Sequence, residues 1–143
     1  MKLFIIITNR LIKLTGHLSK LLSYPFHFLF PKKRFKIPLI SHPKIKSKQA
    51  AKVPRFIWQT NYTNNVSLPM YLNYLFNRLF SLNYKYHYVS TEARLEFISE
   101  TFSDDITNAY KRLTDGASQA DLWRLLVLFH HGGIYMDIDA HLV

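Results

Sequence analysis

Apolar residues recur every three or four positions along the first 30 residues of the chain. They are Leu3, Ile7, Leu11, Leu14, Leu18, Leu21 and Leu22, with Lys2, Asn9, Lys13 and Lys20 on the other side. This spacing predicts one amphipathic helix. Its longest uninterrupted apolar run, residues 3–7, is far shorter than the roughly 20 residues that a membrane span needs. The recurring basic residues and the lack of a cleavage site do not fit a secretory signal peptide.

The remainder of the chain alternates between strand-like and helix-like patterns. Alternating apolar and aromatic residues predict strands over residues 53–60, 84–89 and 134–137. Helical spacing predicts helices over residues 69–82, 91–102, 103–113 and 118–131. The order strand, helix, strand, helices, strand predicts an α/β fold with a mainly parallel, Rossmann-like sheet.

Capping residues define the expected ends of these helices. Pro69 suits the first turn of a helix whose apolar face is formed by Leu72, Leu75, Phe76 and Leu79. The expected N-caps of the later helices are Ser90 or Thr91, Ser103 or Asp104, and Ser118, which follows a turn over residues 114–116. Gly132 and Gly133 are expected to end the last helix.

Composition supports a folded domain, because 48% of the residues are hydrophobic and 15% are aromatic. The chain has no cysteine, which excludes a disulfide scaffold and a cysteine-based zinc site.

Charge divides the chain into two parts. Residues 1–91 carry 15 Lys and Arg and no Asp or Glu. Residues 92–143 carry 4 Lys and Arg and 9 Asp and Glu. We therefore expect residues 1–52 to meet an anionic surface, with the helix over residues 1–30 peripherally associated with a membrane, on its cytoplasmic face. Packing of this helix on its own domain is the main alternative, and no nucleic-acid partner is expected. Residues 31–52, rich in Lys and Pro, are expected to be a linker.

Two carboxylates, Asp137 and Asp139, follow the last predicted strand. On an extended backbone, side chains two residues apart point the same way, about 6.5–7 Å apart along the strand. Two such carboxylates can share a divalent cation, and hard oxygen ligands suit Mg²⁺ or Mn²⁺. Ligands of parallel sheets bind beyond the carboxyl ends of the strands, so this position suits a metal site.

Further candidates lie near the same strand ends. Asp121 and Arg124 are three apart on one helix face and form either a local ion pair or a pair that binds sugar hydroxyls. Trp58 either stacks on a nucleobase or belongs to the core. Gln59 and Thr60 either contact a base or ribose or cap the strand. The weaker metal-ligand candidates are His130, His131 and His141.

Two segments resemble the DXD-motif sugar transferases. Residues 53–60, Val-Pro-Arg-Phe-Ile-Trp-Gln-Thr, resemble the opening strand of that family. Residues 118–139 resemble its signature block, which runs from Ser-Gln-Ala-Asp-Leu-Trp-Arg to His-Gly-Gly-Ile-Tyr-Met-Asp-Ile-Asp. The family includes outer-chain and inositol-phosphoceramide mannosyltransferases and bacterial sugar transferases for capsular polysaccharide and lipopolysaccharide. The resemblance covers about residues 53–143.

The resemblance implies a GT-A fold, a nucleotide-sugar donor, Mn²⁺ or Mg²⁺, and transfer to a glycan or glycolipid with retention at the anomeric carbon. Asp139 would be the principal metal ligand, and Asp137 would contact the ribose or a metal-bound water. Asp121 and Arg124 would hold the donor sugar.

The chain departs from the family pattern in two ways. Trp58 stands where the family usually has His, and Asn61 stands where it often has Trp. The family fold also continues well beyond the aspartate pair, so we expect an incomplete enzyme with little turnover by itself. Two other readings remain: a phosphohydrolase with Asp137 as nucleophile, and a non-enzymatic basic module that binds membranes or nucleic acid.

Overall fold

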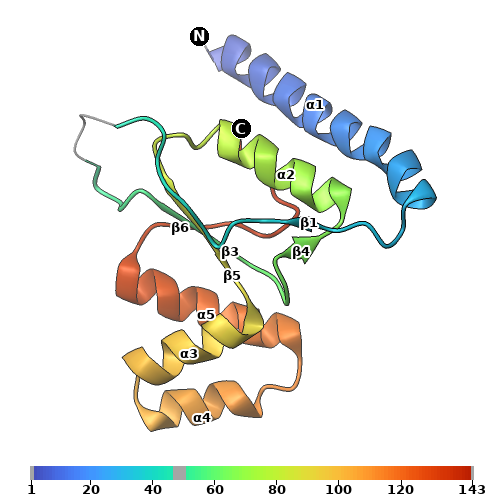
Figure 1. The fold of residues 1–143 in the computed structure, drawn as a ribbon. Helices are drawn as coiled ribbons and strands as arrows, with labels where there is room; N and C mark the ends of the chain where they lie inside the picture. The colour runs from blue at the N-terminus through green and yellow to red at the C-terminus, as the bar shows by residue number, and fades with distance from the viewer. Residues whose placement is uncertain (1, 47–50, 143) are drawn as a thin grey trace. The chain divides into compact units, whose positions relative to one another are not determined.

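The computed structural model describes residues 2–46 and 51–142 (Figure 1). The chain forms two compact units. The helical unit comprises residues 1–37, 65–82 and 138–143, and the sheet unit comprises residues 38–64 and 83–137. The boundary falls between the two aspartates, so that Asp137 belongs to the sheet unit and Asp139 to the helical unit.

The sheet unit contains a four-stranded, mostly parallel sheet. Its strands, in the spatial order β2-β5-β3-β6, are β2 (Ile40–Ser41), β5 (Lys85–Val89), β3 (Phe56–Thr60) and β6 (Ile134–Tyr135). The central strand β3 runs parallel to both β5 and β6, with Trp58 opposite His87 and Tyr135. The predicted α/β class and mainly parallel sheet are confirmed.

The expected linker contributes two short strands. β2 pairs antiparallel with β5 in the sheet unit. β1 (Phe35–Lys36) pairs antiparallel with β4 (Asn65–Val66) in the helical unit. Residues 35–36 and 40–41 are therefore built into the two units through backbone hydrogen bonds, which a reading based on Lys and Pro content does not anticipate.

Three helices gather on one side of this sheet (Figure 1). They are α3 (Thr91–Thr101), α4 (Asp104–Arg112) and α5 (Gly116–His131). Ser90 caps α3 by accepting a hydrogen bond from the Ala93 backbone, and Ser103 is the N-cap residue of α4. Both positions agree with the sequence-based expectation.

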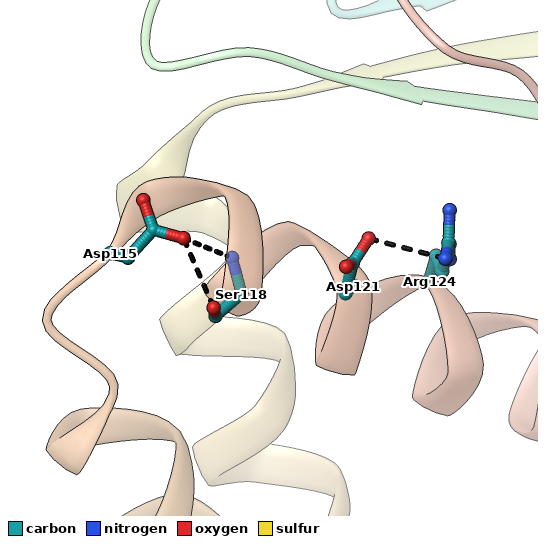
Figure 2. Close-up of polar contacts among 4 residues, drawn as sticks. All are labelled: Asp115, Ser118, Asp121 and Arg124. Atoms are coloured by element: carbon teal, nitrogen blue, oxygen red, sulfur yellow. Dashed lines mark hydrogen bonds and ion pairs between the residues drawn. The ribbon is translucent and has the colours of Figure 1, made fainter.

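The N-cap of α5 differs from the prediction. Asp115 is the cap, and its carboxylate accepts hydrogen bonds from the Ser118 backbone N–H at 2.9 Å and the Ser118 hydroxyl at 3.0 Å (Figure 2). An aspartate three residues before a backbone donor satisfies one of the free N–H groups of the first helical turn. The helix therefore starts at Gly116, and the prediction that Ser118 caps it is wrong.

Aromatic and aliphatic side chains from β3 and the three helices form the core of the sheet unit. Its buried members are Trp58, Ile98, Tyr110, Trp123 and Val127. The Trp58 indole N–H donates a hydrogen bond to the Gly132 carbonyl at 2.9 Å. Gly132 ends α5 with a φ of 67°, as the predicted Gly-Gly stop requires.

The helical unit contains α1 (Lys2–Leu29) and α2 (Leu68–Leu79). Pro69 lies in the first turn of α2, as predicted, but the helix ends at Leu79 and not at Leu82. Its buried residues are Asn73, Tyr74, Asn77 and Arg78, whereas Leu75 and Leu79 are 43% and 63% exposed. The predicted apolar face is thus not the most buried one, because the amides of Asn73 and Asn77 bind the backbone of residues 138–142.

No helix within residues 2–46 and 51–142 combines the length and apolarity that crossing a membrane requires.

Candidate functional site

The last strand stops before the aspartate motif. β6 ends at Tyr135, the Met136 N–H donates to the Trp58 carbonyl at 2.9 Å, and residues 138–139 form a turn. The prediction of a strand through Asp137 with an extended backbone onward to Asp139 is therefore wrong. The side chains of both aspartates are exposed to solvent.

Gln59 holds the backbone at Asp137. Its side chain is 1% exposed, and its Nε2 donates to the Asp137 carbonyl at 2.9 Å. Its Oε1 accepts a hydrogen bond from the Tyr86 hydroxyl at 2.8 Å. Both the nitrogen and the oxygen of the Gln59 amide thus have partners inside the sheet unit. The amide holds the backbone at Asp137 in place.

Three charged side chains lie near Tyr135 in the sheet unit. They are Asp121, Arg124 and Asp137. Arg124 lies 3.2 Å from Asp121, and its guanidinium lies 5.6 Å from the centre of the Tyr135 ring. Figure 2 shows the Asp121–Arg124 pair one turn beyond the capped start of α5. The Asp137 carboxylate lies close enough to Tyr135 to act electrostatically on its hydroxyl. The structure therefore brings together three of the residues chosen from the sequence.

Tyr135 is the site residue that sequence reasoning missed. Burial, followed by the charge of the Asp137 carboxylate, raises the pKa of its hydroxyl to about 12. The hydroxyl therefore keeps its proton at neutral pH. Its position only two residues before Asp137 was the one signal that the sequence offered.

Two buried amides hold the backbone around Asp139 within the helical unit. Asn73 Nδ2 donates to the carbonyls of Ile138 at 2.8 Å and Ala140 at 3.1 Å. Asn77 Nδ2 donates to the Ala140 carbonyl at 2.8 Å, and its Oδ1 accepts from the Leu142 N–H at 2.8 Å. Both asparagines lie on α2, and together they fix the chain on either side of Asp139.

A hollow of about 320 Å³ lies beside Asp139 in the same unit. Tyr24 and His27 of α1 line it together with Ser67 and Asn73. Its volume is near the lower end of ligand pockets, which run from about 300 to 1,000 Å³. Hydroxyl, amide, imidazole and carboxylate groups therefore surround a space of ligand size.

Trp58 sits between two histidine rings. Its indole stacks on His87 with ring centres 4.2 Å apart and on His131 with ring centres 5.3 Å apart. The tryptophan is 7% exposed. This geometry favours the core alternative for Trp58 over stacking on a nucleobase.

The histidines around Trp58 are uncharged at neutral pH. Burial, with a smaller contribution from Lys85, lowers the pKa of His87 to about 4. Burial and then the neighbouring His130 lower the pKa of His131. Neutral rings can pack face to face against an indole, so these histidines belong to the structure of the sheet unit.

Thr60 and His141 also have internal contacts. The Thr60 hydroxyl donates to the Val89 carbonyl at 2.7 Å in the sheet unit. The His141 ring meets His17 and Phe76 edge-on in the helical unit, with ring centres 5.5 and 5.7 Å apart. These contacts give both residues a packing role.

The oxygen ligands at the motif suit a divalent cation. Asp137 and Asp139 each present an exposed carboxylate. Among the described residues, no group of three or more His, Cys, Asp and Glu side chains converges on one point. Mg²⁺ and similar ions commonly use one or two carboxylates and complete their shell with water and substrate phosphates. The residues present therefore fit such a cation.

Asn77→Ala should lower the free energy of unfolding by about 1–3 kcal/mol, because it leaves the Leu142 N–H without its partner and the Ala140 carbonyl with only the bond from Asn73. Urea unfolding measures this loss, and hydrogen exchange at the Leu142 amide should become faster. Asn108→Ala is the control, since Asn108 is an exposed asparagine on α4. Equal stability and equal exchange in the two variants would contradict the role of Asn77.

Comparison with protein families gives one match. Residues 69–143 match the family described as "Glycosyltransferase sugar-binding region containing DXD motif". Searches of curated proteins and of solved structures found no match. The matched region runs from the first turn of α2 through α5 to both aspartates. Since it covers more than half of the chain, the protein belongs to the DXD-motif glycosyltransferase family.

Proposed function

We propose that this protein transfers a sugar from a nucleotide-sugar donor to a hydroxyl of a glycan or glycolipid, with Mn²⁺ or Mg²⁺ as cofactor. The observation that carries the proposal is the family's aspartate motif with two exposed carboxylates and a backbone held by buried amides. Rigid support beneath exposed ligands is what a binding site needs, because it limits the ordering that a ligand must impose.

The side chains near the motif have distinct roles in this proposal. Asp137 and Asp139 would hold the cation. Asp121 would accept hydrogen bonds from hydroxyls of the donor sugar, and Arg124 would donate to its oxygens. The two are 61% and 40% exposed, and such exposed pairs contribute at most about 1 kcal/mol to stability, so ligand groups can replace their mutual contact at small cost.

The reaction breaks the bond between the anomeric carbon and the diphosphate oxygen, and the bonding electrons leave with the nucleoside diphosphate. The acceptor oxygen bonds to the same carbon, and its proton passes to the departing diphosphate. A bound divalent cation supplies positive charge that stabilises the diphosphate as it leaves. Tyr135 would keep its proton during this step, because burial and the Asp137 carboxylate raise the pKa of its hydroxyl.

The finer parts of the proposal rest on family resemblance. They are a GT-A fold, retention at the anomeric carbon, and a hexose donor, with mannose as a candidate. The mostly parallel sheet with helices on one side is compatible with such a fold. Asp137 as the nucleophile of a phosphohydrolase has less support, because the matched family transfers sugars.

Titration calorimetry with UDP- and GDP-sugars tests the proposal on the full chain. We expect one nucleotide class to bind at least about tenfold more tightly in Mn²⁺ than in EDTA, because Asp137 and Asp139 would hold a cation whose charge offsets that of the diphosphate. Failure of every nucleotide sugar to bind in Mn²⁺ would overturn the assignment. Equal affinity in Mn²⁺ and in EDTA would show that donor binding does not need the metal. For an active donor, NMR of the first product decides retention.

A further inference from the structure

The helix α1 exposes its leucines and packs through its small residues. Eight large aliphatic side chains among its described ones are between 48% and 70% exposed. Six of them are Ile7, Leu11, Leu14, Leu18, Leu21 and Leu22. At about 100° per residue they fall in one stripe roughly 100° wide. We call these six residues the leucine stripe.

The opposite side of α1 faces its own unit. Gly16 is buried, and Ser23 is 3% exposed. A Cβ added at Gly16 would lie 3.3 Å from the His141 ring, which shows how closely the helix approaches residues 138–142 there. A helix on a water-soluble domain normally turns its apolar stripe toward the core. In α1 the side that contacts the rest of the helical unit carries Gly16 and Ser23, and the leucine stripe lies on another side.

The charge around the stripe identifies the surface that it fits. Arg10 and Lys13 lie on α1, and Lys32, Lys33 and Arg34 follow its C-terminal end, all of them exposed. The first 91 residues contain no acidic side chain. Exposed aromatic rings at Phe28 (86%) and Phe30 (54%) lie between these two basic groups. An apolar stripe with basic flanks and aromatic residues at one end has the chemistry of a helix that lies in the surface of an anionic bilayer.

We propose that α1 docks on an anionic lipid bilayer, with the leucine stripe among the acyl chains. The basic flank, which we define as Arg10, Lys13 and residues 32–34, lies against the lipid headgroups. The helix lies parallel to the bilayer surface. This inference stands independently of sugar transfer, and it accounts for how a glycolipid acceptor would be reached.

Vesicle flotation tests the proposal on the full chain. Vesicles of phosphatidylcholine alone are compared with vesicles containing 30 mol% phosphatidylglycerol. We expect at least about tenfold more bound protein on the anionic vesicles at 0.1 M salt, and less at 0.5 M salt, because salt screens the headgroup charge. Binding that is equal on the two lipids, or absent from both, would overturn the proposal.

The double variant Leu14→Gln/Leu18→Gln should reduce binding to anionic vesicles by at least about tenfold. Leu125→Gln/Phe129→Gln is the matched control, since these side chains on α5 are 65% and 85% exposed but lie outside the stripe. Circular dichroism establishes that both variants are folded. Loss of binding in both double variants, or in neither, would contradict a specific role of the stripe.

Binding of a partner other than lipid would give different results. Sedimentation that shows a dimer dissociated by Leu14→Gln/Leu18→Gln, without vesicle binding, would assign the stripe to contact between copies and overturn the lipid proposal. Salt-dependent binding to a single-stranded oligonucleotide, again without vesicle binding, would assign the basic flank to nucleic acid and also overturn it.

Discussion

Replacing Asp139 with asparagine should weaken Mn²⁺-dependent binding of the nucleotide sugar by about 100-fold or more and leave the fold intact. Asp139 is exposed in the turn over residues 138–139. Asn73 holds the carbonyls on both sides of it, so the exchange removes charge without removing the backbone support. A ligand to a divalent cation contributes several kcal/mol, and each 1.36 kcal/mol corresponds to a factor of ten.

Three measurements separate loss of the cation from loss of the fold. Electron paramagnetic resonance reports Mn²⁺ binding, calorimetry reports donor affinity, and circular dichroism reports the melting temperature. Asp105→Asn is the control, because it removes an exposed carboxylate in the first turn of α4. If Asp139→Asn binds Mn²⁺ and donor as Asp105→Asn does, Asp139 is not a metal ligand.

The second large effect concerns stability. Gly133→Ala should lower the free energy of unfolding by about 2–5 kcal/mol. Gly133 has a φ of 99°, which strains any residue with a side chain. A Cβ there would lie 2.8 Å from the Phe56 carbonyl oxygen and 3.0 Å from Trp58 Nε1. The loss combines backbone strain with overpacking, each of which costs about 1–3 kcal/mol.

Gly116→Ala provides the matched control for this substitution. No atom lies within 4 Å of a Cβ placed at Gly116, which is the first residue of α5. We expect its stability to be unchanged or to rise by up to about 1 kcal/mol, because alanine restricts the unfolded chain and favours helix. Urea unfolding followed by circular dichroism compares the two variants. A Gly133→Ala protein as stable as Gly116→Ala would rule out the close approach of Gly133 to β3.

Local patterns were enough to predict most elements of this chain. Alternation predicted β5, and the spacing of apolar residues with Ser90 and Ser103 as caps predicted α3 and α4. These signals lie within a few residues of the element that they define, so they can be read without knowing the fold. The prediction of Ser118 as the cap failed on the same local scale, because Asp115 lies only three positions earlier and is an equally good capping residue.

The candidate site was predicted only in part. Asp121, Arg124 and Asp137 all lie near Tyr135, since the first two share a helix face and the strand before the third pairs with β3. The strand was expected to continue through the aspartates, but it ends at Tyr135. Tyr135, which lies near both Arg124 and Asp137, was overlooked because an aromatic residue in a short apolar strand reads as core.

The sequence by itself determined the class of the fold, the family and the identity of the two carboxylates, because these follow from local periodicity and from residues at fixed spacing. Only the tertiary structure decided which partners the amides bind and that the leucines are exposed. Nothing in the sequence distinguishes Gln59 and Asn77 from exposed amide side chains. In the structure each binds a backbone group more than 60 residues away. In sequence the leucine stripe of α1 fits either a membrane surface or a core face, and in the structure it is exposed. Side-chain type fixes which bonds a residue can make, and long-range packing chooses the partner.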